Sequence, residues 1–92
     1  MPLVRRTSLA DSDLADIWAF IAHDSVEAAD RLVDRIISNH ETLARFPLIG
    51  EEYHVRGESI RRFVVGNYVT FYIPETDGIL VYRVLHLSLI HI

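Results

Sequence analysis

Arginine is the residue type in this chain that is best suited to recognising another molecule. All nine basic residues are Arg, and none is Lys. A guanidinium suits bidentate recognition of carboxylates and phosphates, although a codon bias toward Arg would give the same composition. Arg61 and Arg62 are neighbours on a predicted strand, so their side chains should point to opposite faces of a sheet. Arg83 lies in an apolar run, where it is expected as an exposed strand residue, an ion-pair member or an anion contact.

The motifs of well-known enzyme classes are absent. There is no P-loop, no G-x-S-x-G and no H-E-x-x-H in the chain. The five His residues lack metal-ligand spacing, and the absence of Cys removes thiolate ligands and nucleophiles. His40 falls on the apolar stripe of a helix and is expected as a hydrogen-bonded core residue. Two carboxylate pairs, Asp13 with Asp16 and Glu51 with Glu52, are explained by a helix terminus and a solvated loop. We therefore expect no metal and no cofactor.

Length and charge limit the function classes further. The 92 residues should form one domain, residues 1–92. A net charge of −4 argues against a general binder of nucleic-acid backbones, whose affinity comes from basic side chains. No apolar stretch approaches the roughly 20 residues of a membrane span, and the lack of Cys fits a reducing cytosol, so we predict a cytoplasmic protein. Half of the residues are apolar, which predicts that part of the apolar surface lies at an interface.

Helical periodicity dominates the first half of the chain. A short strand is expected at residues 3–6, and a helix from about residue 9 to about residue 23, with Thr7 or Ser8 as its N-cap. Ser8 and Asp11 resemble a capping box. Residues 24–25 end this helix and cap a second one, which ends at Phe46 because the residue before Pro47 avoids the α region. The short link between them predicts an antiparallel helical hairpin.

The second half of the chain has the composition of strands. Residues 60–65, 68–73 and 79–86 are rich in β-branched and aromatic residues, with turn residues between them. Short links predict a three-stranded antiparallel meander. Residues 49–58 contain Gly and several charged residues and are expected to form a surface loop. The predicted fold is α+β, in the order β-α-α-β-β-β, an antiparallel sheet with a helical hairpin packed on one face.

Four segments resemble the RelE/ParE toxin superfamily. They are residues 13–18 (DLADIW), 46–50 (FPLIG), 60–72 (IRRFVVGNYVTFY) and 83–86 (RVLH). Together they span nearly the whole chain, in an order and at a length that are fairly specific for the superfamily. The resemblance implies a toxin of a type II toxin–antitoxin system, held inactive by a cognate antitoxin.

The superfamily contains two activities. RelE-like members cleave mRNA in the ribosomal A site, whereas ParE-like members share the fold and poison DNA gyrase. Residues 13–18 and 67–72 look more like the ParE side, and an acidic chain without Lys is poorly suited to work inside the ribosome. We therefore predict a ParE-like gyrase inhibitor that is not an enzyme. The alternatives are a RelE-like endoribonuclease and an inactive module that only binds an antitoxin.

The resemblance also suggests which residues act. Target binding is expected from the sheet residues Arg61, Arg62, Arg83 and His86. A RelE-like member would use Arg61, Arg83 and His86 for catalysis. Antitoxin binding, by a ParD-like ribbon-helix-helix protein in a hetero-oligomer, is expected from Trp18, Ile21, Tyr68 and Tyr72.

The C-terminal tail, residues 87–92, departs from the superfamily. Small and polar residues usually follow the last strand there, whereas this tail is mostly apolar. Its alternation of apolar and polar residues could extend the last strand. If this segment carries toxicity, the chain is weakened or inactive as a toxin.

Overall fold

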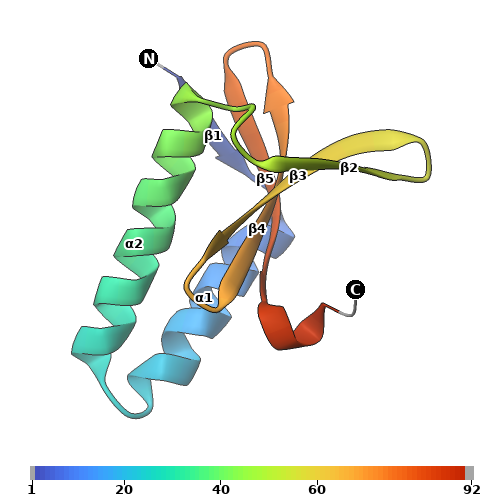
Figure 1. The fold of residues 1–92 in the computed structure, drawn as a ribbon. Coiled ribbons are helices and arrows are strands. Elements are labelled where there is room, and N and C mark those ends of the chain that lie inside the picture. The colour runs from blue at the N-terminus through green and yellow to red at the C-terminus, as the bar shows by residue number, and fades with distance from the viewer. Residues whose placement is uncertain (1, 91–92) are drawn as a thin grey trace.

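Two antiparallel helices cover one face of a five-stranded sheet (Figure 1). The computed structural model describes residues 2–90. The elements follow in the order β1 (Leu3–Arg6), α1 (Ser8–Ala22), α2 (Val26–Arg45), β2 (Glu51–Val55), β3 (Glu58–Val65), β4 (Tyr68–Glu75), β5 (Gly78–His86) and a 3-10 helix, η1 (Leu87–Leu89). We call the sheet face that lies away from the helices the open face.

The strand order β1-β5-β4-β3-β2 confirms the predicted α+β fold and its antiparallel meander. One pairing differs from the prediction, because β1 lies parallel to β5 and makes the sheet mixed. The helical hairpin and strands β2 to β4 lie between these two strands in sequence. A local reading of turns cannot detect such a pairing.

Residues 49–58 were expected to be a loop, and that expectation is wrong. They contain the strand β2, which pairs antiparallel with β3 from Glu51 opposite Arg62 to Val55 opposite Glu58. The charged residues that suggested a loop are satisfied across the strands: Arg62 donates to Glu51 at 2.8 Å, and Ser59 donates to Glu52 at 2.7 Å. Opposite partners on paired strands stabilise a sheet.

Side-chain caps fix where the helices begin. The Thr7 hydroxyl accepts the Ala10 N–H at 3.0 Å, and the Ser25 hydroxyl accepts the Ala28 N–H at 3.1 Å. Thr7, one of the two predicted candidates, is therefore the N-cap of α1. The capping box predicted at Ser8 and Asp11 is wrong, because Ser8 already lies inside the helix. The second helix stops before Pro47, as predicted, with Phe46 as its C-cap.

The core lies between the helices and the inner face of the sheet. Its largest fully buried side chains include Tyr72, Ile36, Leu43 and Ile79. His40 is also fully buried, which confirms it as a core histidine. The Nε and Nη2 atoms of Arg6 lie 3.3 and 3.2 Å from Nδ1 of His40, and Nε2 of His40 lies 2.9 Å from the Thr70 hydroxyl. A guanidinium has only donors, so Nδ1 accepts and Nε2 carries the proton.

The tail does not continue β5. The strand ends at His86, and residues 87–89 turn into η1, tied to the β3–β4 turn by the Leu87 N–H, which donates to the Asn67 carbonyl at 2.8 Å. The predicted extension of the strand is therefore wrong for residues 87–90. Its last two positions, 91–92, lie outside the described residues.

Candidate functional site

A bulge in β5 turns two consecutive side chains to the open face. Phe71 pairs with Arg83 but Tyr72 pairs with Val81, so Tyr82 is an extra residue in the ladder. Val81 is buried on the helix side, whereas Tyr82 is 47% exposed. A bulge of this kind redirects side chains. It allows Tyr82 and Arg83 to share the open face.

Two of the predicted target-binding residues meet there. Arg62 on β3 and Arg83 on β5 are the cross-strand neighbours of Phe71 on β4. Tyr53 on β2 completes the group: its ring packs edge-on against Phe71 with centroids 6.1 Å apart, and the Arg62 guanidinium lies 5.4 Å from its centroid. We call Tyr53, Arg62, Phe71 and Arg83 the central row. Its chemistry is that of flat aromatic and guanidinium surfaces.

Both arginines of the row have an acidic partner. Arg83 donates to the two carboxylate oxygens of Asp13 at 2.8 and 2.9 Å, and the Val84 N–H donates to the same carboxylate at 2.9 Å. This hydrogen bonding raises the pKa of Arg83 above its usual value. β1 ends opposite Val81, so Asp13 on α1 satisfies the strand edge that β1 does not reach. Sequence reasoning missed this role of Asp13, because the two residues lie 70 positions apart.

Arg61 lies on the other face, as alternation predicted. It pairs with the buried Tyr72 and donates to the carbonyls of Leu48 and Gly50 at 3.1 and 2.6 Å. Tyr72 binds the same segment between α2 and β2: its hydroxyl accepts the Gly50 N–H at 2.9 Å and donates to the Pro47 carbonyl at 2.8 Å. A Cβ at Gly50 would collide with that hydroxyl. Arg61 and Tyr72 therefore clamp residues 47–50 to the sheet, and we call this arrangement the clamp.

His86 lies apart from the row, at the end of β5. Its Nδ1 accepts the Ser88 N–H at 3.0 Å and caps η1, and its ring packs edge-on against Tyr68 with centroids 5.1 Å apart. The structure therefore brings together Arg62 and Arg83, but neither Arg61 nor His86 joins them.

The residues predicted to bind the antitoxin differ in exposure. Trp18 is 38% exposed and donates from its indole to Asp30 at 2.8 Å, while Ile21 is half-buried. Tyr68 is 8% exposed, and Tyr72 is fully buried. Tyr72 thus has no side-chain surface to offer a partner, because the clamp uses both its ring and its hydroxyl.

Sequence reasoning missed an apolar cleft between α1 and the tail. Its volume is about 370 Å³, and its lining includes Ile17, Phe20, Tyr68, Leu85 and Leu89. Phe20 is 75% exposed and Leu89 65%. The position of Phe20 outside the apolar stripe of its helix is the feature of the sequence that could have indicated this cleft.

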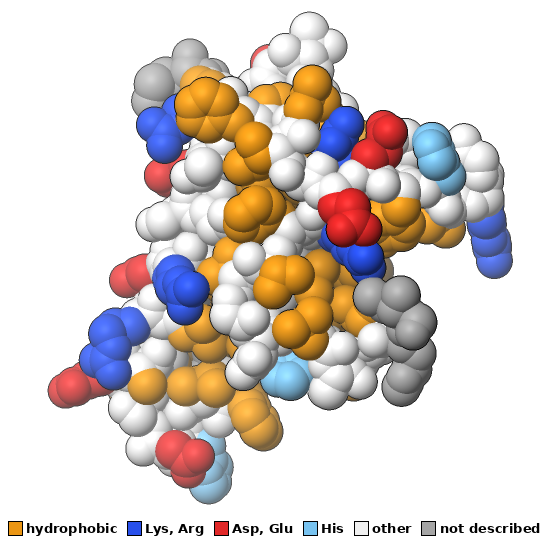
Figure 2. Space-filling model, viewed as in Figure 1, with side chains coloured by type: hydrophobic (Ala, Val, Ile, Leu, Met, Phe, Trp, Pro, Cys, Tyr) orange, Lys and Arg blue, Asp and Glu red, His pale blue; other side chains and the backbone are white. Residues whose placement is uncertain are grey.

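The outer edge of β3 is incomplete at its C-terminal end. The pairing with β2 stops at Arg62, so residues 63–65 have no strand on that side within the described part of the chain. Phe63 there is half-buried, and Val64 is 50% exposed. Hydrophobic side chains form a band beside α2 in this part of the molecule (Figure 2). An unpaired strand edge is a template for another strand.

Metal and membrane sites can be assessed within residues 2–90. No group of three or more His, Asp or Glu side chains there could hold a metal ion. Neither α1 nor α2 combines the length and hydropathy needed to cross a membrane.

Comparisons with known proteins give a family and a fold. The family model described as the ParE toxin of the type II toxin-antitoxin system parDE matches residues 4–88. Ten chains of solved structures match at a significant level. One is described as the chromosomal ParDE TA system from P. aeruginosa, with a TM-score of 0.76 and 18% identity, over 95% of this chain and 97% of that one. No curated protein matches at that level.

Proposed function

We propose a function for this chain on the premise that it belongs to the ParE toxin family of type II toxin-antitoxin systems. The chain acts in the cytoplasm by inhibiting DNA gyrase, performs no bond cleavage of its own, and is neutralised by a ParD-like antitoxin with which it forms a hetero-oligomer.

The observation that carries this proposal is that the residues a RelE-like ribonuclease would use are engaged in structural contacts. Arg61 donates to two backbone carbonyls, Arg83 is bound by Asp13, and His86 caps η1. Catalysis of phosphate cleavage needs donors aimed at the position where negative charge develops. Arg61 also lies on the opposite face from Arg83, so the two could not act on one phosphate.

The central row offers gyrase a contact surface of a different kind. Arg62 and Arg83 are fixed by Glu51 and Asp13, but their side chains keep 25% and 35% of their surface exposed beside the Phe71 ring. Aromatic and arginine side chains held rigidly are the usual anchors of protein interfaces. Arg61 and His86 would then support this surface from the clamp and from η1.

The proposal is tested with two assays on one preparation. The purified chain is incubated with gyrase holoenzyme and relaxed plasmid, and separately with ribosomes programmed with mRNA. We expect supercoiling to be inhibited and the mRNA to remain intact. Codon-positioned cuts together with unaffected supercoiling would replace the proposal by the RelE-like activity. Neither effect would identify an inactive module and direct attention to the tail.

The antitoxin is proposed to cover the helical hairpin and the free edge of β3. Tyr68 lines the cleft between α1 and the tail, where Phe20 is the most exposed aromatic side chain. Trp18 and Ile21 lie on the same helix, with Trp18 turned toward α2 by its hydrogen bond to Asp30. Residues 63–65 can accept an added strand, whose backbone hydrogen bonds supply affinity while side-chain pockets supply specificity. Tyr72 is left out of this surface because it is buried.

Calorimetry tests this partner. The product of the adjacent reading frame is titrated into the chain at several temperatures. Folding of an antitoxin tail onto about 1,000–3,000 Å² of surface gives a large negative heat-capacity change. A heat-capacity change near zero would contradict coupled folding. Undiminished binding after Phe20→Ser and Val64→Ser are combined would contradict the proposed location of the antitoxin surface.

A further inference from the structure

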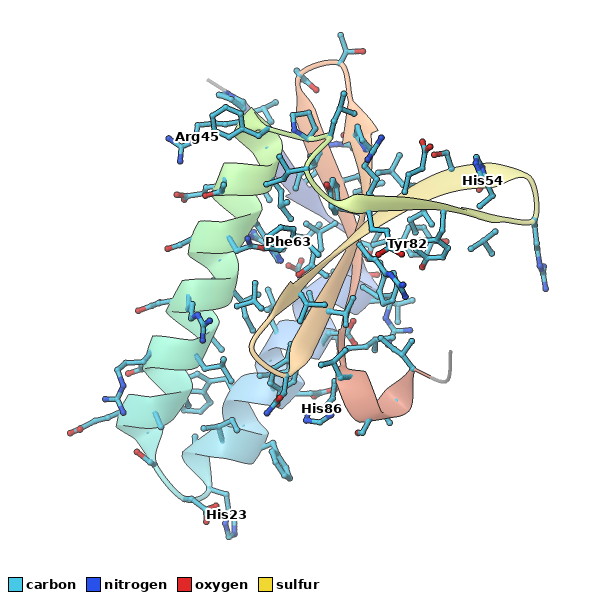
Figure 3. All side chains as sticks on the ribbon, viewed as in Figure 1. His23, Arg45, His54, Phe63, Tyr82 and His86 are labelled. Atoms are coloured by element: carbon cyan, nitrogen blue, oxygen red, sulfur yellow. The ribbon has the colours of Figure 1, made fainter. Side chains whose placement is uncertain are left out.

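β2 and β3 extend past the rest of the sheet as a two-stranded arm, residues 53–60 (Figure 1). β3 first pairs with β4 at Arg61, so the backbone of the arm pairs only with itself, as Tyr53 with Ile60, His54 with Ser59, and Val55 with Glu58. The ring of Tyr53 packs on Phe71 at the base of the arm. Figure 3 places His54 on the arm far from both helices. A two-stranded ribbon is marginally stable by itself, and none of the arm belongs to the buried core. The arm therefore contributes little to the packing of the core and leaves its surface available to another molecule.

The turn at the tip of the arm contains an unexpected arginine. Arg56 has a φ of 52° and Gly57 a φ of 82°, which puts both central residues in the left-handed region. Turns of this kind favour Asn or Gly at the first position, because a larger side chain is strained there. Arg56 is exposed, and its guanidinium has no ion-pair partner among residues 2–90. The chain thus keeps a free cation where a neutral residue would fold better.

An apolar cleft lies directly beside this cation. Its volume is about 310 Å³, and Val55, Ile60, Ile73 and Tyr82 line it, with Arg56 and Glu58 also at its border. Val55 and Tyr82 are each 47% exposed. The bulge in β5 supplies Tyr82, so the same irregularity serves both the central row and this cleft.

The chemistry of the cleft fits a protein better than a nucleic acid. The arm contains one Arg and one Glu, so it has no basic patch to neutralise phosphates, although the two side chains form no ion pair. An apolar cleft beside one unpaired guanidinium suits an apolar side chain next to a carboxylate, held by a charge-assisted hydrogen bond. The surface proposed for the antitoxin lies at the other end of β3, which leaves the arm to the target.

We infer that the arm extends the gyrase-binding surface beyond the central row. Val55 and Tyr82 hold an apolar side chain of gyrase, and Arg56 pairs with a carboxylate beside it. This inference rests on the proposed function.

The test exploits the strain at the tip. Arg56→Asn suits the left-handed turn, so its melting temperature should equal or exceed that of the unmodified chain. The concentration needed to inhibit supercoiling by gyrase holoenzyme should nevertheless rise about tenfold or more, as expected for loss of a charge-assisted contact. Val55→Thr, which keeps a β-branched shape, should also raise the concentration needed to inhibit supercoiling. Arg45→Gln removes another exposed arginine, at the end of α2, and should leave both the melting temperature and the inhibitory concentration essentially unchanged.

Each outcome decides between the two levels of the proposal. If the unmodified chain inhibits gyrase and Arg56→Asn inhibits it equally well, the arm is not part of the interface, although the proposed function stands. If the unmodified chain does not inhibit gyrase, the proposed function fails, and the target assigned to the arm fails with it. If the chain binds the relaxed plasmid alone and Arg56→Asn abolishes that binding, the arm contacts nucleic acid, which overturns the assignment to a protein.

Discussion

At the scale of single residues, Asp13 joins α1 to β5 by binding a charged side chain and a strand-edge N–H together. Its side chain is only 11% exposed, whereas that of Arg83 is 35% exposed. Water can therefore compensate Arg83 in part if the carboxylate loses its charge. The Asp13–Arg83 pair is better understood as a device that orients Arg83 than as a large source of stability.

Asp13→Asn tests this role, because an amide oxygen can still accept the Val84 N–H. We expect the free energy of unfolding in urea to fall by about 1–3 kcal/mol through loss of the charge-assisted bonds. Asp34→Asn, at an exposed position on α2, should stay within about 0.5 kcal/mol. A loss for Asp13→Asn no greater than that of the control would show that the ion pair contributes nothing measurable.

His40 makes the stability of the fold depend on pH. Burial, and secondarily the charge of Arg6, lower the pKa of His40 to about 4 from a usual 6.5. Between these values the unfolded chain binds more protons than the folded one, so stability rises with pH across this window. From about pH 4 to pH 6.5 the free energy of unfolding should increase by about 3 kcal/mol from this residue.

Urea denaturation at several pH values measures this dependence. Carboxylates such as Glu75, whose pKa is lowered by its hydrogen bond to Arg5, add a loss of stability in acid that is independent of His40. His40→Gln separates the two effects, because an amide can bond to both Arg6 and Thr70 without titrating. An unchanged slope between pH 5 and 6.5 in that variant would assign the dependence to other groups.

At the scale of elements, the clamp connects the end of α2 to the sheet. Tyr72→Phe keeps the buried ring but removes the hydroxyl that serves Gly50 and Pro47. We expect the free energy of unfolding to fall by about 1–3 kcal/mol, because the Gly50 N–H is left without its acceptor. Tyr82→Phe, which alters an exposed ring, is the matched control for stability. Equal losses in the two variants would mean that water replaces the hydroxyl at the clamp.

The clamp also explains why the FPLIG segment is recognisable in the sequence. Pro47 ends a helix, Gly50 leaves space for the Tyr72 hydroxyl, and the carbonyls of Leu48 and Gly50 accept hydrogen bonds from Arg61. The resemblance therefore reflects a packing requirement, and this segment offers no catalytic group.

At the scale of the whole molecule, the parts that were predictable are those set by local patterns. The caps at Thr7 and Ser25, the stop at Phe46 and the β3–β4 turn all follow from residues close in sequence. The pairing of β1 with β5 and the contact between Asp13 and Arg83 depend on residues about 70 positions apart. Alternation did place Arg61 and Arg62 on opposite faces, but it could not show which other residues would meet them.

β2 was missed for a different physical reason. Its charged residues have the composition of a solvated loop, and their satisfaction depends on partners in β3 that a single segment does not reveal. Because β2 was not predicted, the site residues that it carries were not predicted either. Arg62 was identified, but Tyr53 and the arm around Arg56 were not.

The bulge at Tyr82 divides β5 into two halves of opposite parity. Up to Val81 the buried side chains occupy odd-numbered positions, as at Ile79, whereas Val84 beyond the bulge is even. Deleting Tyr82 would restore a regular ladder in which Val81 and Val84 still face the helices and Arg83 still faces the open side. A chain with this fold that lacks a residue here could therefore keep the same buried and exposed positions on both halves of the strand. Position 82 is thus an insertion that adds one side chain to the open face and leaves the core unchanged, and an alignment by sequence alone would be free to move it.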